Sequence, residues 1–95
     1  MTILQIEHRV ADFDRWRTAF ESDPVGREEG GVRRYRILRP LDDPNYVVVE
    51  LEFESASDAE AFRGELHSLW ERAREGLGLE NPLARVVEVV ETREY

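Results

Sequence analysis

The chain of 95 residues contains neither cysteine nor lysine. Without cysteine it has no disulfide framework, no thiolate nucleophile and no cysteine-ligated zinc site. All 13 basic residues are arginine, so Schiff-base chemistry and a lysine general base are excluded as well. The absence of lysine is typical of a genome that is biased toward GC-rich codons.

The sequence also lacks a long hydrophobic run and an excess of positive charge. No apolar stretch approaches the roughly 20 residues that cross a bilayer, and residues 1–5 lack the basic region and apolar stretch of a signal peptide. We therefore expect a cytoplasmic protein with no membrane partner. The formal net charge of -8 disfavours nucleic acid as a partner, because phosphate binding draws on a basic surface.

The composition is that of a soluble globular protein, with 41% hydrophobic and 36% charged residues. The length predicts a single domain over residues 1–95 with a modest hydrophobic core. Because such a core leaves little reserve of stability, a chain of this size often gains by forming oligomers.

Residues 46–53, Tyr-Val-Val-Val-Glu-Leu-Glu-Phe, carry the clearest pattern in the chain. Read with a period of two, alternate positions from Val47 to Phe53 are all apolar, which predicts a strand with one face on a core. The other face is mixed and carries Tyr46, Val48, Glu50 and Glu52. The pattern indicates a sheet with helices on one side and a partly covered surface on the other.

A strand and a helix are predicted near the N-terminus. Residues 3–10 form the strand, and its core face carries Leu4, Ile6, His8 and Val10. Asp12 is the predicted N-cap of a helix that runs to about Ser22, with aromatic residues at helical spacing: Phe13, Trp16 and Phe20. Asp23-Pro24 and Gly26 end this helix, and residues 24–31 form a loop with room for one helical turn.

Residues 32–39 predict a second strand, which the turn-rich segment 40–45 connects to residues 46–53 as an antiparallel hairpin. We place Tyr35 and Ile37 on the core face; the opposite face carries Val32, Arg34, Arg36 and Leu38. Residues directly opposite each other share a face of a sheet. The reverse parity would bury two arginines in the core at prohibitive cost, so Arg34 and Arg36 are predicted to pair with Glu50 and Glu52.

The C-terminal half predicts a helix and a last strand. Ser57-Asp58-Ala59-Glu60 has the pattern of a capping box, and Gly76 and Gly78 are expected to end the helix. Its apolar stripe comprises Phe62, Leu66, Leu69, Trp70, Ala73 and Leu77. Asn81-Pro82 is predicted to be a turn before a strand over residues 84–92, and Glu94-Tyr95 a short tail.

The element order is therefore β-α-β-β-α-β, which predicts an α+β protein with a ferredoxin-like fold. Right-handed crossovers place the first and third strands in the centre of a four-stranded antiparallel sheet, with both helices on one face. Other families share this order. RNA-recognition modules carry basic and aromatic residues on the third strand, metal chaperones carry a Cys-x-x-Cys loop, and acylphosphatases have an anion-binding loop after the first strand. This sequence has none of these features.

Three segments carry a more specific resemblance. They are Glu7-His8-Arg9-Val10-Ala11-Asp12-Phe13-Asp14-Arg15-Trp16, then Gly31-Val32-Arg33-Arg34-Tyr35, and residues 46–53. Together with the length and the element order, they resemble the dimeric α/β-barrel superfamily, which includes antibiotic-biosynthesis monooxygenase-like proteins. The first segment is similar to a His-x-Val-x-Asp-aromatic-x-x-Trp pattern in small members of that superfamily.

The resemblance implies a homodimer in which two sheets pack face to face into a barrel. The partner subunit would then cover the face that carries Tyr46, Val48 and the Arg–Glu network. It also implies a small-molecule site between the helices and the sheet, used in this superfamily for cofactor-independent oxygenation, isomerisation or cyclisation of aromatic or polyketide-like compounds. No cofactor and no metal ion are expected.

Within that site, His8 and Tyr35 are the polar residues expected on the core face of the sheet. His8 is the candidate general base, and Tyr35 a candidate donor to a developing negative charge. The candidate ligand-binding residues are Trp16, Phe20, Phe62, Leu66 and Trp70. For all seven, a place in the core without any catalytic role is the alternative interpretation, and His67 is expected to be exposed or at the rim.

Two alternatives for function remain open. The first is an enzyme of the kind just described, and the second is a dimeric binding or stress-associated protein without catalytic activity. The cluster of Glu7, Arg34, Arg36, Glu50 and Glu52 is interpreted as structural charge pairing, because two arginines lie among the carboxylates. No spacing of His, Asp and Glu resembles a metal site, and Gly30-Gly31 enters a strand and not a helix, so it is no phosphate cradle.

Overall fold

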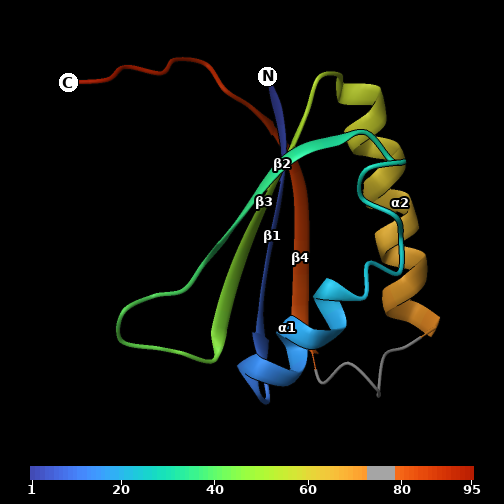
Figure 1. Cartoon of the computed structure of the whole chain (residues 1–95), viewed down its shortest axis with the longest axis vertical. Helices are drawn as coiled ribbons and strands as arrows, with labels where there is room; N and C mark the ends of the chain where they lie inside the picture. The colour runs from blue at the N-terminus through green and yellow to red at the C-terminus, as the bar shows by residue number, and fades with distance from the viewer. Residues whose placement is uncertain (73–78) are drawn as a thin grey trace.

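In the computed structural model, six elements succeed one another in the predicted order (Figure 1). The structure describes residues 1–72 and 79–95. The elements are β1 (Thr2–Val10), α1 (Phe13–Glu21), β2 (Val32–Leu38), β3 (Tyr46–Phe53), α2 (Ala56–Arg72) and β4 (Leu79–Glu88). The strands form one antiparallel sheet in the order β2-β3-β1-β4, so the predicted ferredoxin-like fold, with β1 and β3 in the centre, is confirmed.

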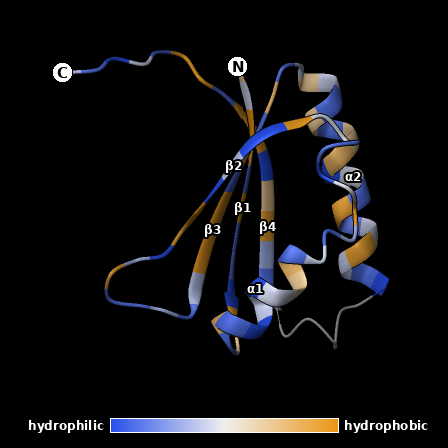
Figure 2. Ribbon diagram, viewed as in Figure 1, coloured by the Kyte–Doolittle hydropathy of each residue, from blue (hydrophilic) through white to orange (hydrophobic). Residues whose placement is uncertain are grey.

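Both helices lie on the same side of the sheet (Figure 1). Burial alternates strictly along β3, where Val47, Val49, Leu51 and Phe53 are buried and the residues between them are partly exposed. In Figure 2 hydrophobic and hydrophilic stretches are interspersed along the ribbon of α2. None of the helices in residues 1–72 and 79–95 is long and apolar enough to cross a membrane.

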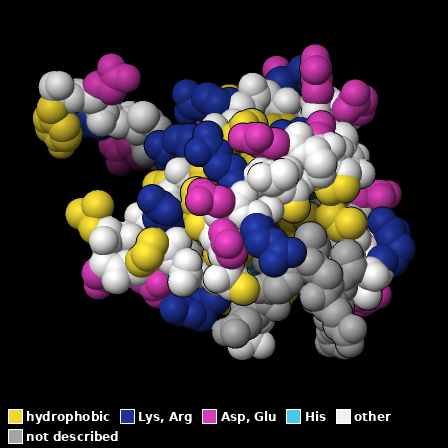
Figure 3. All heavy atoms as spheres, turned by 60° about the horizontal axis from the view of Figure 1, so that its bottom comes forward, with side chains coloured by type: hydrophobic (Ala, Val, Ile, Leu, Met, Phe, Trp, Pro, Cys, Tyr) yellow, Lys and Arg dark blue, Asp and Glu magenta, His cyan; other side chains and the backbone are white. Residues whose placement is uncertain are grey.

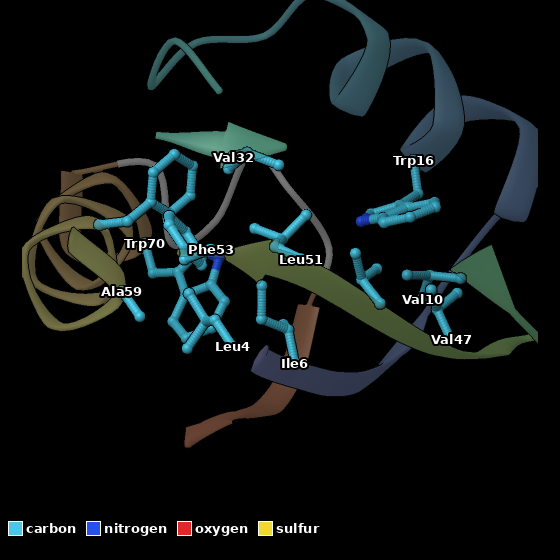
Figure 4. Close-up of a cluster of buried hydrophobic side chains, with 12 residues drawn as sticks. Leu4, Ile6, Val10, Trp16, Val32, Val47, Leu51, Phe53, Ala59 and Trp70 are labelled. Carbon is cyan, nitrogen blue, oxygen red and sulfur yellow. The ribbon is translucent and has the colours of Figure 1, made fainter. Parts of the chain in front are cut away.

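The core has two ends, one under each helix. Figure 4 places Trp16 of α1 near Val10 and Val47 on one side, and Trp70 and Ala59 of α2 on the other. Residues of the two central strands, including Ile6 and Leu51, lie between these ends. The two tryptophans therefore flank the middle of the sheet and do not stack on each other.

On the opposite face of the sheet, the predicted Arg–Glu network is confirmed. Arg34 stands opposite Glu52 and Arg36 opposite Glu50, and each pair is joined by a hydrogen bond. Tyr46 adds a bond from its hydroxyl to Glu7, 2.7 Å long. Acidic and basic side chains also lie side by side over the face of the molecule seen in Figure 3.

The predicted orientation of Val32 is wrong. Val32 pairs with Phe53, whereas Arg34 pairs with Glu52, so β2 has one extra residue between two pairs. This β-bulge at Arg33 turns Val32 back to the core face, where it is buried. Gly31 enters the strand with a φ of +97°, a conformation that suits glycine.

The N-terminus of α2 also differs from the prediction. The cap is Ser55, since its Oγ accepts a hydrogen bond from the backbone N–H of Asp58 at 3.1 Å. Ser57 already lies inside the helix. The Ser-x-x-Glu pattern that starts at Ser57 was misleading because Ser-x-x-Asp, starting at Ser55, offers an equivalent cap two residues earlier. The predicted helix end at Gly76 and Gly78, with stripe residues Ala73 and Leu77, lies outside the described residues.

The last strand begins and ends earlier than predicted. Asn81-Pro82 is not a turn between elements but lies within β4, where the pairing with β1 shifts by one residue between Leu83 and Glu80. Asn81 has a φ of +47° at this bulge, and Pro82 is tolerated because β4 is an edge strand. β4 ends at Glu88, and the remaining residues lead away from the sheet (Figure 1).

The position of the α2 cap can be tested by two alanine substitutions. Ser55→Ala removes the acceptor for the Asp58 N–H and is expected to lower the free energy of unfolding by about 1 kcal/mol. Ser57→Ala is the matched comparison: among the described residues the Ser57 hydroxyl forms a hydrogen bond only with that of Ser55, at 3.2 Å, and accepts from no backbone N–H, so its loss should change the free energy of unfolding by less than about 0.5 kcal/mol. Urea denaturation measures both. Equal losses in the two variants would contradict the assignment of Ser55 as the cap.

Candidate functional site

A hollow of about 90 Å³ lies between the helices and the sheet. Ile6, Val49 and Leu51 form its floor on the two central strands. Both helices and the connection between α1 and β2 supply the walls, whose described residues include Trp16, Ala19, Phe20, Asp23, Pro24, Val25, Arg27, Phe62, Leu66, Leu69 and Trp70. The site thus sits between the two ends of the core, where neither tryptophan fills the space.

Six of the seven residues proposed from the sequence line this hollow: His8, Trp16, Phe20, Phe62, Leu66 and Trp70. Tyr35 does not. It lies on the helix side of the sheet but on the edge strand β2, where its side chain is 43% exposed and packs edge-on against Phe20 at 5.1 Å between ring centroids. His67 is exposed, as expected, and its ring lies edge-on to Trp70.

Among the residues that the structure describes, His8 is the one polar residue that is buried, with 4% of its surface exposed. Its Nδ1 lies 3.3 Å from the carbonyl oxygen of Arg9, so the neutral tautomer with a proton on Nδ1 donates to that oxygen. Nε2 then carries a lone pair, and no described residue forms a hydrogen bond with it. Burial lowers the pKa of His8 below its ordinary value, an effect that the bond to Arg9 partly offsets, so the imidazole is neutral near pH 7.

Aromatic rings extend from His8 along α1. His8 meets Trp16 edge-on at 5.8 Å between ring centroids, and Trp16 stacks on Phe20 at 5.2 Å. The indole nitrogens of Trp16 and Trp70 are drawn on the sides of their rings that face the middle of the core (Figure 4). Neither makes a hydrogen bond with a described residue, so both remain donors for a ligand oxygen.

The sequence did not point to Arg27, which also lines the hollow. Its guanidinium lies over the rings of Phe20 and Tyr35, at 4.1 and 5.0 Å from their centroids. Asp23 lies beside it, with Oδ1 at 3.6 Å from Nη1. The (i, i+4) spacing of Asp23 and Arg27 was the available signal, but both stand in a loop whose path the sequence pattern does not define.

The charged cluster on the other face has the character of a structural network. Each of its arginines is matched by a glutamate directly opposite on the next strand. Within residues 1–72 and 79–95 no group of three or more His, Asp or Glu side chains is placed to hold a metal ion. The chemical groups that converge on a space are therefore those of the hollow: a neutral imidazole, two indole N–H groups, a guanidinium and the carboxylate of Asp23.

Comparison with known proteins supports the fold. Neither protein-family models nor curated proteins match the sequence. Solved structures do match: the chain shares its ferredoxin-like fold with antibiotic biosynthesis monooxygenase-like proteins, which confirms the fold that the resemblance implied.

Three of these structures illustrate the similarity. A candidate antibiotic biosynthesis monooxygenase from Deinococcus radiodurans is 12% identical with a TM-score of 0.75, and the alignment covers 100% of this chain and 98% of that one. SnoaB, a cofactor-independent oxygenase from Streptomyces nogalater, is 16% identical with a TM-score of 0.72 over 96% and 94% of the two chains. A dimeric ferredoxin-like protein from an uncultured marine organism is 16% identical with a TM-score of 0.68 over 97% and 96%.

The state of His8 has a consequence for stability that can be measured. Because the pKa of His8 is lowered in the folded protein, the unfolded chain takes up a proton first as the pH falls through about 6.5. The free energy of unfolding therefore decreases as the pH falls below that value. His8→Gln removes this contribution, so the stability advantage of the wild type over the variant should shrink between pH 7.5 and pH 5.

Urea denaturation of both proteins at several pH values tests this expectation. His67→Gln is the matched control for the loss of a histidine, because His67 is exposed, and the stability of both variants is compared with that of the wild type at each pH. A stability difference between wild type and His8→Gln that stays constant from pH 7.5 to pH 5 would count against a buried, neutral His8.

Proposed function

We propose that this protein binds a small aromatic compound in the hollow between helices and sheet, and that His8 acts there as a general base. The reaction class is that of a cofactor-independent monooxygenase, isomerase or cyclase. The observation that carries the proposal is the condition of His8: it is buried in the wall of the hollow, its Nδ1 is fixed by Arg9, and its Nε2 is uncommitted. A general base needs an unprotonated nitrogen whose lone pair is not already engaged, and Nε2 of His8 meets this condition.

The other residues of the hollow support the same chemistry. Trp16, Phe20, Phe62 and Trp70 offer ring faces and edges to a planar ligand. Nε2 of His8 would remove a proton from a hydroxyl or an acidic C–H group of that ligand. The indole N–H groups of Trp16 and Trp70 would then stabilise the negative charge that develops on the ligand oxygen. Tyr35 would act indirectly, by packing against Phe20 at the edge of the site.

The volume of the hollow limits the ligand. At about 90 Å³ it is smaller than the cavity of ~150 Å³ that encloses benzene in a protein core. A single aromatic ring, or one ring of a larger polyketide-like compound, therefore enters with part of its surface outside the hollow. This small volume is also the observation that favours the alternative, a binding protein without catalytic activity.

An experiment on His8 separates the two functions. Oxygen uptake and product formation are followed with hydroxylated single-ring aromatics, namely catechol, hydroquinone and 4-hydroxybenzoate, without added cofactor. For an enzyme, His8→Gln should lower the turnover rate by about 10²- to 10⁴-fold, while His67→Gln retains it. Quenching of tryptophan fluorescence reports binding in the same samples. Binding without turnover in the wild type would support the alternative, and absence of both would sink the proposal.

We also propose that two copies associate through the sheet face that carries Tyr46, Val48 and the Arg–Glu pairs, forming an α/β barrel. The similar protein from an uncultured marine organism is described as dimeric. Val48 is partly exposed on this face, between Glu7 on β1 and Leu38 on β2. A partner sheet packed against it would remove this apolar surface from water.

Light scattering coupled to size exclusion tests this association. The wild type should elute with the mass of a dimer at micromolar concentration. Val48→Asp places an unpaired charge in the proposed interface and should yield monomers. Ala61→Asp, on the exposed side of α2, is the matched control and should remain dimeric. A wild-type monomer, or a dimer that both variants retain, would contradict an interface on this face.

A further inference from the structure

Of the described residues that line the hollow, Arg27 is the one with a positively charged side chain. It stands in the connection between α1 and β2, and its side chain is only 17% exposed. A guanidinium withdrawn from water to this extent loses hydration and needs partners for its charge and its donors. What surrounds Arg27 therefore indicates what kind of ligand group the site accepts.

The guanidinium is held in position without a ligand. Nη1 donates a hydrogen bond to the carbonyl oxygen of Phe20 at 2.7 Å, and the group lies over the ring of Phe20 and near that of Tyr35. The backbone is fixed as well, because the N–H of Arg27 donates to Asp23 Oδ1 at 2.8 Å. A side chain that is ordered beforehand binds a ligand with a smaller loss of entropy.

Most of the donors of Arg27 remain unused. A guanidinium has five N–H groups. In Arg27 one of them, on Nη1, donates a hydrogen bond to a described residue, the carbonyl oxygen of Phe20. Asp23 offsets part of the positive charge, but its Oδ1 stands 3.6 Å from Nη1 and already accepts the backbone N–H. The charge is thus tolerated in a largely buried site, while Nε and Nη2 form no hydrogen bond with a described residue.

We propose that Arg27 binds an acidic oxygen of the ligand, so that the protein selects aromatic molecules that carry a carboxylate. The planar guanidinium matches a carboxylate with two parallel N–H donors. His8 and Arg27 lie at opposite ends of the run of rings formed by Trp16 and Phe20. The carboxylate is therefore held at the end of the hollow away from the base. This inference rests on the proposed ligand site, and it adds the charge of the ligand.

A matched pair of probes tests the selection for an acid. 4-Hydroxybenzoate and 4-hydroxybenzamide have nearly the same size and shape, but only the first is an anion at pH 7. Isothermal titration at low salt should show the acid binding to the wild type about 10- to 100-fold more tightly than the amide. A charge-assisted hydrogen bond gives a difference in affinity of this size. Added salt should reduce the difference.

Variants assign this preference to one residue. Arg27→Met keeps the aliphatic stem over Phe20 but removes the charge and the donors, so the two probes should bind with affinities within about threefold of each other. Arg33→Gln is the matched control, because Arg33 is an exposed arginine of β2 paired with Glu54 at the surface, and it should keep the wild-type preference. Arg27→Lys, which retains the charge without the planar donors, should show an intermediate preference.

The outcomes distinguish the role of Arg27 from the existence of the ligand site. Equal binding of acid and amide to the wild type overturns the role of Arg27 but leaves the proposed ligand site standing. An acid preference that persists in Arg27→Met overturns it as well. If neither probe binds to the wild type, both the ligand site and the role of Arg27 are refuted. Thermal unfolding of each variant shows whether it is folded, and if Arg27→Met is not, Arg27→Lys and the wild-type comparison decide.

Discussion

The pairing of β1 with β3 is the constraint on which the rest of the structure depends. Leu4, Ile6 and His8 stand opposite Leu51, Val49 and Val47, which concentrates the apolar side chains of both central strands on one face. Because side chains alternate along a strand, a shift by one residue would send all of them to the other face. Both helices pack on this face, and His8 is its buried polar residue among those that the structure describes, so the core and the candidate site have the same origin.

Alternation of apolar residues and the positions of charges were enough to predict the regular part of the sheet. The Arg–Glu pairs could be placed because the reverse parity would have buried Arg34 and Arg36. The errors in side-chain orientation and turn placement within the sheet lie at single-residue irregularities. Val32 faces the core because of a bulge at Arg33, and Asn81-Pro82 lies in a strand because another bulge accommodates a positive φ and a proline at an edge. A bulge costs little and depends on the neighbouring strand, so a local pattern does not reveal it.

Some residues of the candidate site could also be predicted from the sequence, and others could not. Residues on regular elements, such as His8 and Trp16, could be placed on the core face from their spacing alone. Tyr35 was placed on the correct face, but spacing does not tell how far from the centre of the sheet its strand lies. Arg27 escaped prediction because its position depends on a loop, on the carbonyl oxygen of Phe20 and on two ring faces. Loops carry much of the specificity of binding sites, and their paths are the least predictable part of a fold.

The two edges of the sheet have a consequence for how the molecule meets other chains. An open edge strand offers unpaired N–H and carbonyl groups to any extended peptide, and it is a common route to aggregation. Here β2 carries Arg33, Arg34 and Arg36 around a bulge, and β4 carries Pro82 and a second bulge. Each irregularity bends an edge that would otherwise be straight, and the arginines repel a second copy of the same strand. The two bulges, which could not be predicted from the sequence, thus also help to prevent an acidic chain with a small hydrophobic core from polymerising edge to edge.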